Sequence, residues 1–249
     1  MLTPPKINTE QRRAIAKRKS QLERITPLVA EWVSIPATDV KLFVTRPESI
    51  DTVLDHVIDD PEQNLPYWAE IWPSGIALAT ELLQNPSLVR GLPVIEIGSG
   101  VGITAAAALM AGADLTITDY SPHSLLLAEV NCLRAGQMAP PSRQMNWRNP
   151  SADLMQGSGE PWPIVLAADV LYERRDIEPI LDVLDRITAL DGLVLLAEPG
   201  RLPAEEAMEL AAERNWHIET KKHTGPWPDT KEADVVVTVH SMRRRQSGH

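Results

Sequence analysis

One stretch, from Val94 to Asp119, constrains the fold of this chain more than any other. It reads VIEIGSGVGITAAAALMAGADLTITD: a short apolar run, glycines at alternating positions, an alanine-rich segment, and a second apolar run that ends in an acid. This order predicts strand, tight turn, helix and strand, because glycine tolerates the backbone conformations that such a turn requires. Such a unit belongs to a parallel sheet with a right-handed crossover. The stretch therefore predicts an α/β fold whose glycine turn faces a nucleotide-like ligand.

The spacing of the glycines separates two classes of ligand. Dinucleotide-binding proteins carry G-x-G-x-x-G or G-x-G-x-x-A, in which the third small residue permits close packing of helix on strand. Gly98 and Gly100 fit this pattern, but Ile103 occupies the third position and the third glycine is Gly102. The shift is compatible with S-adenosylmethionine, which has no pyrophosphate and whose amino-acid end approaches a bare backbone. The alternative is a tight turn that binds nothing.

Asp119 strengthens the interpretation of the turn as a binding site. It ends the second predicted strand, about 20 residues after the glycines, where dinucleotide-binding folds place a ribose-binding acid. A carboxylate there accepts hydrogen bonds from both ribose hydroxyls, and either class of ligand has a ribose. A solvated acid at a strand end is the alternative, but the combination with the glycine turn favours ligand binding.

The remaining pattern alternates helices and strands, which predicts a parallel sheet covered on both faces. We expect a Rossmann-like fold with seven strands, mostly parallel, whose last strand is antiparallel because no helix separates the final two. Residues 1–62 form a predicted N-terminal extension that begins with a basic helix capped by Asn8 and Gln11. Residues 63–249 form the main domain. The elements expected in the domain are helices at 74–84, 103–111, 122–135, 176–189 and 203–214, and strands at 93–97, 115–118, 143–146, 164–168, 193–197, 216–221 and 234–240. The extension is expected to contain a strand at 41–45 and a second helix at 49–58.

Composition narrows the class of protein. The net charge of −10 and the isoelectric point near 5.1 argue against a general nucleic-acid binder, which requires a basic surface. The single cysteine, Cys132, excludes an intramolecular disulfide and a thiolate metal cluster, and no metal-ligand spacing occurs. No apolar run approaches the roughly 18 residues of a membrane helix. We expect a cytoplasmic protein without metal or membrane association.

Four segments carry a resemblance to a known family. They are LPYWAEIWPSGIALATEL at 65–82, VIEIGSGVG at 94–102, the pair Asn146–Trp147, and LAADVLYE at 166–173. Their order and spacing resemble the seven-β-strand, or class I, S-adenosylmethionine-dependent methyltransferases that include many protein-lysine methyltransferases. The segments TPLVA at 26–30 and EPGR at 198–201 are most similar to the branch that methylates the β-subunit of electron transfer flavoprotein, together with its bacterial relatives.

The resemblance implies S-adenosylmethionine as cofactor, S-adenosylhomocysteine as product, and a role for each matching position. Trp72 would lie over the cofactor, Asp119 would hold the ribose with Tyr120 beside it, Trp147 would stack near the adenine, and Ala168 would line the pocket. The residues around the methionine moiety would be Glu96, Gly98, Gly100 and Gly102. The tryptophans suit this role physically as well, because a sulfonium cation and a flat purine both favour aromatic faces.

Asp169 and Tyr172 are the predicted catalytic residues. They follow the strand predicted at 164–168, at the sheet edge where open α/β folds bind ligands. Many amine methyltransferases carry an acid or amide, two prolines and an aromatic residue there; this chain keeps the acid and the aromatic but has neither proline. A carboxylate can hold an acceptor amine and aim its lone pair at the methyl carbon. The alternative is a helix-capping acid and a packing tyrosine.

We therefore expect a methyltransferase that modifies a lysine side chain of a protein partner. Two alternatives stay open: an N-methyltransferase of small amines with a more enclosed acceptor pocket, and a binding module that keeps the fold without turnover. The sequence does not determine the oligomeric state.

Overall fold

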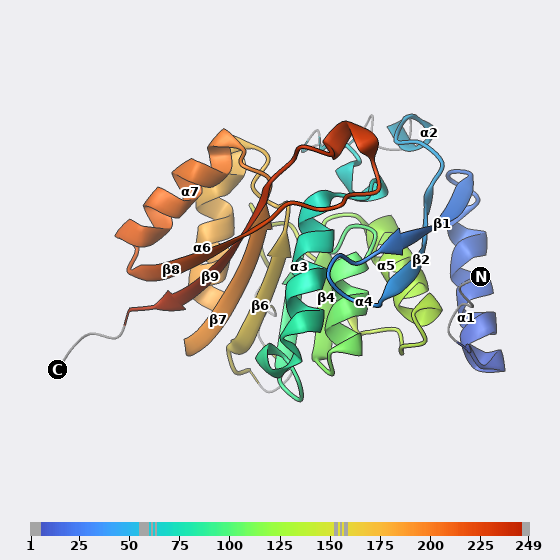
Figure 1. The fold of residues 1–249 in the computed structure, drawn as a ribbon, viewed down its shortest axis with the longest axis horizontal. Coiled ribbons are helices and arrows are strands. Elements are labelled where there is room, and N and C mark those ends of the chain that lie inside the picture. The colour runs from blue at the N-terminus through green and yellow to red at the C-terminus, as the bar shows by residue number, and fades with distance from the viewer. Residues whose placement is uncertain are drawn as a thin grey trace.

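A computed structural model describes residues 6–54, 60, 62, 64–151, 154, 156 and 159–245. Its centre is a seven-stranded sheet of order β5-β4-β3-β6-β7-β9-β8 (Figure 1). The strands are β3 (Pro93–Ile97), β4 (Asp114–Asp119), β5 (Ser142–Gln144), β6 (Trp162–Ala168), β7 (Thr188–Glu198), β8 (Trp216–His223) and β9 (Val237–Arg244). Five strands run parallel, and β9 is antiparallel to both β7 and β8. The predicted fold class, including the reversed last strand, is confirmed.

Helices cover both faces of this sheet (Figure 1). One face carries α3 (Pro73–Gln84), α4 (Ile103–Met110) and α5 (Pro122–Arg134), and the other carries α6 (Ile177–Ile187) and α7 (Leu202–Glu213). Successive side chains of a strand point to opposite faces. Accordingly Val94 packs with the first set of helices and Ile95 with the second. The central strands are buried on both faces, as their continuous apolar runs predict.

The N-terminal extension packs onto this domain. Helix α1 (Thr9–Leu22) begins with the predicted capping box of Asn8 and Gln11 and lies against α5, to which Arg18 forms an ion pair with Glu129. A two-stranded antiparallel ribbon follows, made of β1 (Leu28–Ser34) and β2 (Lys41–Pro47). Leu22 of α1 enters the core shared with α3, α4 and α5. Three ribbon side chains and the residue after β1 join it: Val33, Leu42, Val44 and Ile35.

A buried asparagine fastens the ribbon to the domain. Asn131 of α5 accepts a hydrogen bond from the Thr45 N–H at 2.7 Å and donates to the Thr45 carbonyl at 2.8 Å. Its amide also donates to the Val101 carbonyl at 2.7 Å. One side chain therefore satisfies both backbone groups of Thr45 on the ribbon edge, and links the extension to the glycine loop.

Some boundaries differ from the prediction. Strand β1 was not predicted, because its side chains are mostly half-exposed and its only described partner strand is β2. The helix expected at 49–58 is present as α2 (Asp51–Leu54), and residues 55–58 of that prediction lie outside the described residues. The last strand begins at Val237, later than predicted, and extends to Arg244 because it pairs with β8 along its whole length.

Candidate functional site

The site lies where the strand order reverses. The chain runs from β3 outward to β4 and β5, then returns to place β6 on the other side of β3. Ligands of open α/β sheets bind at the carboxyl ends of the strands at such a switch point. The structure has a cavity of about 400 Å³ there, lined by residues that follow β3, β4, β5 and β6 and by the segment before α3. This volume is in the range of small-molecule sites.

The glycine loop after β3 forms the floor of the cavity. Gly98, Gly100 and Gly102 have φ of +69°, +50° and +81°, a region that favours glycine. A Cβ on Gly100 would meet only the Trp68 carbonyl oxygen, at 3.9 Å, so the backbone is bare on the side of the cavity. Gly98 also lines the cavity, and a Cβ there would lie 2.9 Å from Val170.

Gly102 has a different position from the one predicted. It does not line the cavity; a Cβ on it would lie 2.6 Å from the Cα and 2.8 Å from the Cβ of Ala128. Gly102 is the N-cap of α4, and its missing side chain lets α4 approach α5. Gly102 thus serves the packing of α4 on α5 and does not lie on the cavity wall, where the prediction had placed it.

Two buried acids lie near the glycine loop, Glu96 in β3 and Asp119 at the end of β4. Asp119 lines the cavity; its Oδ2 accepts from the Gly100 N–H at 3.0 Å and its Oδ1 from the Ser121 N–H at 2.9 Å. Glu96 is buried, interacts electrostatically with Asp119 and does not line the cavity; its Oε2 has no hydrogen-bond partner among the described residues. Burial raises the pKa of Asp119, and burial together with the nearby charge of Asp119 raises the pKa of Glu96 well above its usual value. The Glu96 side chain interacts with Thr104 of α4 and is not on the cavity wall, where we expected it.

Tyr120 follows Asp119 on the cavity wall, as the prediction placed it. Its hydroxyl donates to Asp60 Oδ1 at 2.5 Å. Burial and this hydrogen bond raise the pKa of Tyr120 to about 12, so the hydroxyl stays protonated as a donor.

A row of aromatic rings forms one wall. Trp72, Tyr67, Tyr172 and Trp147 meet edge to face in that order, with centroid separations of 6.1, 5.1 and 6.2 Å. All four line the cavity. Such arrangements are favourable between aromatic rings and present π faces to a cation. The Trp147 Nε1 is buried and has no hydrogen-bond partner among the described residues, which leaves one donor on this wall unsatisfied.

Asp169 closes the cavity at the end of β6, beside Ala168, which also lines it. Its φ is +56°, an uncommon value for a residue with a side chain, and its N–H donates to the Ala197 carbonyl at 2.8 Å. Asp169 Oδ2 accepts from Ser74 Oγ at 3.1 Å, and Oδ1 accepts from Arg201 Nε at 3.3 Å. Burial raises the pKa of Asp169, and Arg201 and Ser74 limit the rise. Strained backbone of this kind is concentrated at functional sites.

The structure thus brings nine of the predicted site residues to one cavity, which are Trp72, Gly98, Gly100, Asp119, Tyr120, Trp147, Ala168, Asp169 and Tyr172. Among the neighbouring residues that the sequence did not predict, three make contacts that bear on the site. Tyr67 joins the aromatic row, Arg201 pairs with Asp169, and Arg148 lines the cavity while binding Asp176 at 2.7 Å and Glu62 at 2.6 Å. Tyr67 and Arg201 stood in the segments that carried the family resemblance, so that signal was present; Arg148 had none.

The donors and surfaces of the cavity fit S-adenosylmethionine. The bare Gly100 backbone has room for the amino-acid end, Asp119 is an acceptor for ribose hydroxyls, and aromatic faces suit both sulfonium and purine. The unsatisfied Trp147 N–H provides a donor for a ligand group. Within the described part of the chain, no group of three or more His, Cys, Asp or Glu side chains could hold a metal ion. Among the described helices, none has the length and apolarity required to cross a bilayer.

Comparison with solved structures supports the fold. The fold matches the N-methyltransferase NodS from Bradyrhizobium japonicum, solved with S-adenosylhomocysteine, at a TM-score of 0.56 and 16% identity, covering 79% of this chain and 99% of that one. The fold is therefore the Rossmann-like fold of class I S-adenosylmethionine-dependent methyltransferases, and the cavity fits their cofactor.

Sequence comparison gives the family. A family model described as lysine methyltransferase matches residues 58–211, and the chain belongs to that family. It is 33% identical over 142 residues to the electron transfer flavoprotein β-subunit lysine methyltransferase of Homo sapiens, covering 55% of this chain and 50% of that protein. It is 30% identical over 132 residues to the protein N-lysine methyltransferase METTL21A of Danio rerio, covering 52% of this chain and 59% of that protein. The chain therefore spans about half the length of the curated relatives it matches.

Proposed function

We propose that this protein transfers a methyl group from S-adenosylmethionine to the side-chain amine of a lysine on a protein partner. The observation that carries the proposal is the shared cavity, which Asp169 and Tyr172 line together with the glycine loop and Asp119. The residues that would bind the cofactor and the carboxylate that would hold the amine therefore line one cavity, so both reactants can be bound there together. Membership of the lysine methyltransferase family supports lysine as the acceptor.

When bound, the cofactor supplies an electrophilic methyl group on a sulfonium, and the electrons of the broken carbon–sulfur bond stay on sulfur. The residues of the chain position the acceptor. Asp169 is held by Ser74 and Arg201, so its free lone pairs accept hydrogen bonds from an amine that enters along the aromatic row. Tyr172, with its ring against Tyr67 and Trp147, narrows the path for the acceptor chain. In-line displacement depends strongly on such alignment.

The first acceptor to test is the β-subunit of electron transfer flavoprotein, since the curated relative from Homo sapiens carries that substrate in its name. Purified flavoprotein and an extract of host cells would each be incubated with the enzyme and radiolabelled S-adenosylmethionine. Label in a protein band, located on lysine by mass spectrometry, is the expected result. Label confined to small molecules would favour the small-amine alternative. Cofactor binding without transfer to any acceptor would favour the binding module.

The matched variant is Asp169→Asn, because asparagine tolerates the positive φ at this position better than alanine does. We expect turnover to fall on the order of 10²-fold or more, with S-adenosylhomocysteine affinity nearly unchanged. Asp191→Asn removes an exposed acid of β7 far from the cavity and serves as the control. Equal losses of turnover and cofactor affinity would assign Asp169 to the cofactor pocket instead.

A further inference from the structure

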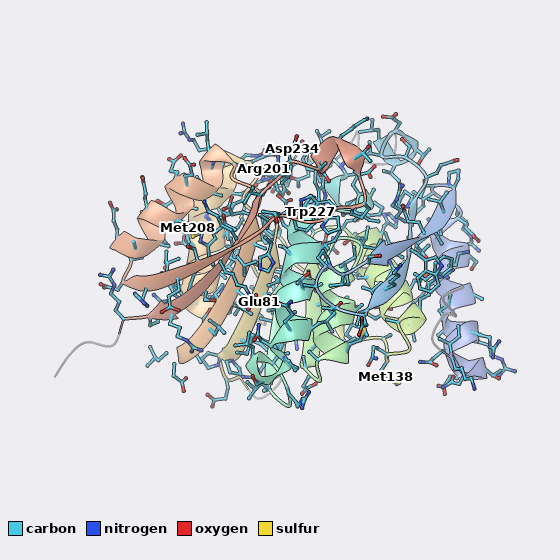
Figure 2. The ribbon with its side chains drawn as sticks, viewed as in Figure 1. Glu81, Met138, Arg201, Met208, Trp227 and Asp234 are labelled. Atoms are coloured by element: carbon cyan, nitrogen blue, oxygen red, sulfur yellow. The ribbon has the colours of Figure 1, made fainter. Side chains whose placement is uncertain are left out.

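Arg201 lies beside the cavity, where it forms an ion pair with the buried Asp169 and is itself partly exposed to solvent. It follows β7, at the end of the molecule where β6 and β7 terminate (Figure 2). Its Nε lies 3.3 Å from Asp169 Oδ1, and its guanidinium carbon lies 5.6 Å from the centre of the Trp72 ring. The Asp169 side chain is 7% exposed and that of Arg201 is 39% exposed. Among the described residues, Asp169 is the acid with which Arg201 forms an ion pair.

This pairing bears on a chemical problem of the proposed reaction. A lysine amine has a pKa of about 10.4, and only its neutral form has a lone pair for attack. A carboxylate raises the pKa of a neighbouring amine, because opposite charges stabilise each other. A buried, unpaired Asp169 would therefore hold the acceptor as an unreactive ammonium. A cation on the same carboxylate opposes this effect.

We propose that Arg201 is a positioning residue that neutralises Asp169, so that the acceptor lysine sheds its proton to solvent and binds as a neutral amine. Asp169 then keeps its hydrogen-bond acceptors for aiming the amine, while its charge is already compensated. The Trp72 ring fixes the guanidinium beside the carboxylate through its π face. The inference rests on the proposed function, since it assigns a role within lysine methylation.

Other titratable groups lie around this pair. The charge of Glu198 of β7 acts on Asp169, and Glu232 of η4 (Thr230–Glu232) interacts electrostatically with both Asp169 and Arg201. His240 of β9 lies beside Glu198, and Glu70, after η1 (Tyr67–Ala69), lies near Glu232. Glu198 is occupied elsewhere: its Oε1 lies 3.1 Å from His240 Nε2 and its Oε2 accepts from the Gly200 N–H. Glu232 adds negative potential around Arg201 and Asp169. Glu198 and Glu232 add negative potential here, and Arg201 is the cation that forms an ion pair with Asp169 among the described residues, so its charge opposes their effect on the proton affinity of the acceptor.

The test is the pH dependence of methyl transfer to the acceptor protein identified above, at saturating cofactor, from about pH 7 to about pH 10. In Arg201→Gln the amine loses a neighbouring positive charge, so the acidic limb of the turnover profile should move to higher pH. A unit charge about 6 Å away in a partly exposed site is worth about one pH unit. Turnover near pH 7 should then fall about tenfold and recover near pH 10. Arg201→Lys keeps the charge and should keep the limb close to its original position.

Two controls separate charge from structure. Arg243→Gln removes an equal charge at the far end of β9 and should leave the profile unchanged. S-adenosylhomocysteine affinity should stay the same in every variant, which establishes that the cofactor site is intact. A limb that stays in place in Arg201→Gln, or that moves equally in Arg201→Gln and Arg201→Lys, would overturn the inference. If the unaltered enzyme labels no protein, the proposed function itself fails, and that outcome is visible before any variant is made.

Discussion

Replacing Gly102 with alanine tests the packing role that the structure gives this residue. Two costs add. The φ of +81° is unfavourable for a residue with a Cβ, by roughly 1–2 kcal/mol. The new Cβ would also lie 2.6 Å from Ala128 Cα and 3.1 Å from Ala128 O, both backbone atoms of α5 that cannot rotate away. Overpacking of this kind typically costs 1–3 kcal/mol. We expect the free energy of unfolding to fall by about 2–5 kcal/mol.

The measurement is urea denaturation followed by circular dichroism, supported by thermal unfolding. A domain of this size loses roughly 2–4 °C in Tm per kcal/mol, so Tm should fall by roughly 4–20 °C. Gly91→Ala is the matched control, because Gly91 has φ +72° and no atom within 4 Å of a built Cβ. It should show the backbone cost alone. If the two variants were equally stable, the close approach of α4 and α5 would not explain why glycine stands at position 102.

Three further predictions concern buried polar groups. Glu96→Gln should raise Tm, and should raise it more at pH 8 than at pH 5. Because the pKa of Glu96 is raised in the folded protein, its contribution to stability is full below about pH 4.5 and is lost as pH rises toward the folded pKa. An equal effect on Tm at both pH values would contradict this. Trp147→Phe should weaken S-adenosylhomocysteine binding by about 1 kcal/mol in calorimetry, because the ligand loses a hydrogen-bond donor. The stability of the free protein should not fall, since the Trp147 N–H has no partner among the described residues. Unchanged affinity would mean that no ligand group accepts a hydrogen bond from Trp147. Asn131→Ala should lower the free energy of unfolding by about 2–4 kcal/mol, because the N–H and the carbonyl of Thr45 both lose a hydrogen-bond partner. Hydrogen exchange at the Thr45 amide should become faster. A change in the free energy of unfolding below about 0.5 kcal/mol would show that the ribbon is held by its apolar contacts alone.

The sequence predicted the sheet well because its central strands are short apolar runs bounded by turn residues. Strand β3 was predicted at its observed bounds, and the absence of a helix before β9 correctly indicated a reversed last strand. Strand β1 was missed because a half-exposed ribbon strand has neither a continuous apolar run nor strict alternation.

The candidate site was predicted less completely than the fold. Residues that follow a strand directly, such as Asp119 and Asp169, were found because parallel strands bring their carboxyl ends to one edge. Gly102 was misplaced because spacing along the chain does not tell which side of a turn faces a neighbouring helix. Arg148 reaches the cavity through a long side chain, and no local pattern predicts such a contact. Arg201 stood in a segment that carried the family resemblance, but its ion pair with Asp169 joins two segments far apart in the chain.

The backbone at Asp169 has a consequence for how relatives of this chain are compared. A φ of +56° is tolerated by glycine and, among residues with side chains, best by asparagine and aspartate. Natural selection on folding alone would thus retain a short acid or amide here, even in a descendant that had lost its enzymatic activity. The identity of residue 169 is therefore a poor diagnostic of turnover in divergent sequences. Arg201 adopts an ordinary backbone conformation, with φ of −79°, that places no such restriction on its side chain. Joint retention of Asp169 and Arg201 would separate active lineages from inactive ones better than either residue considered singly.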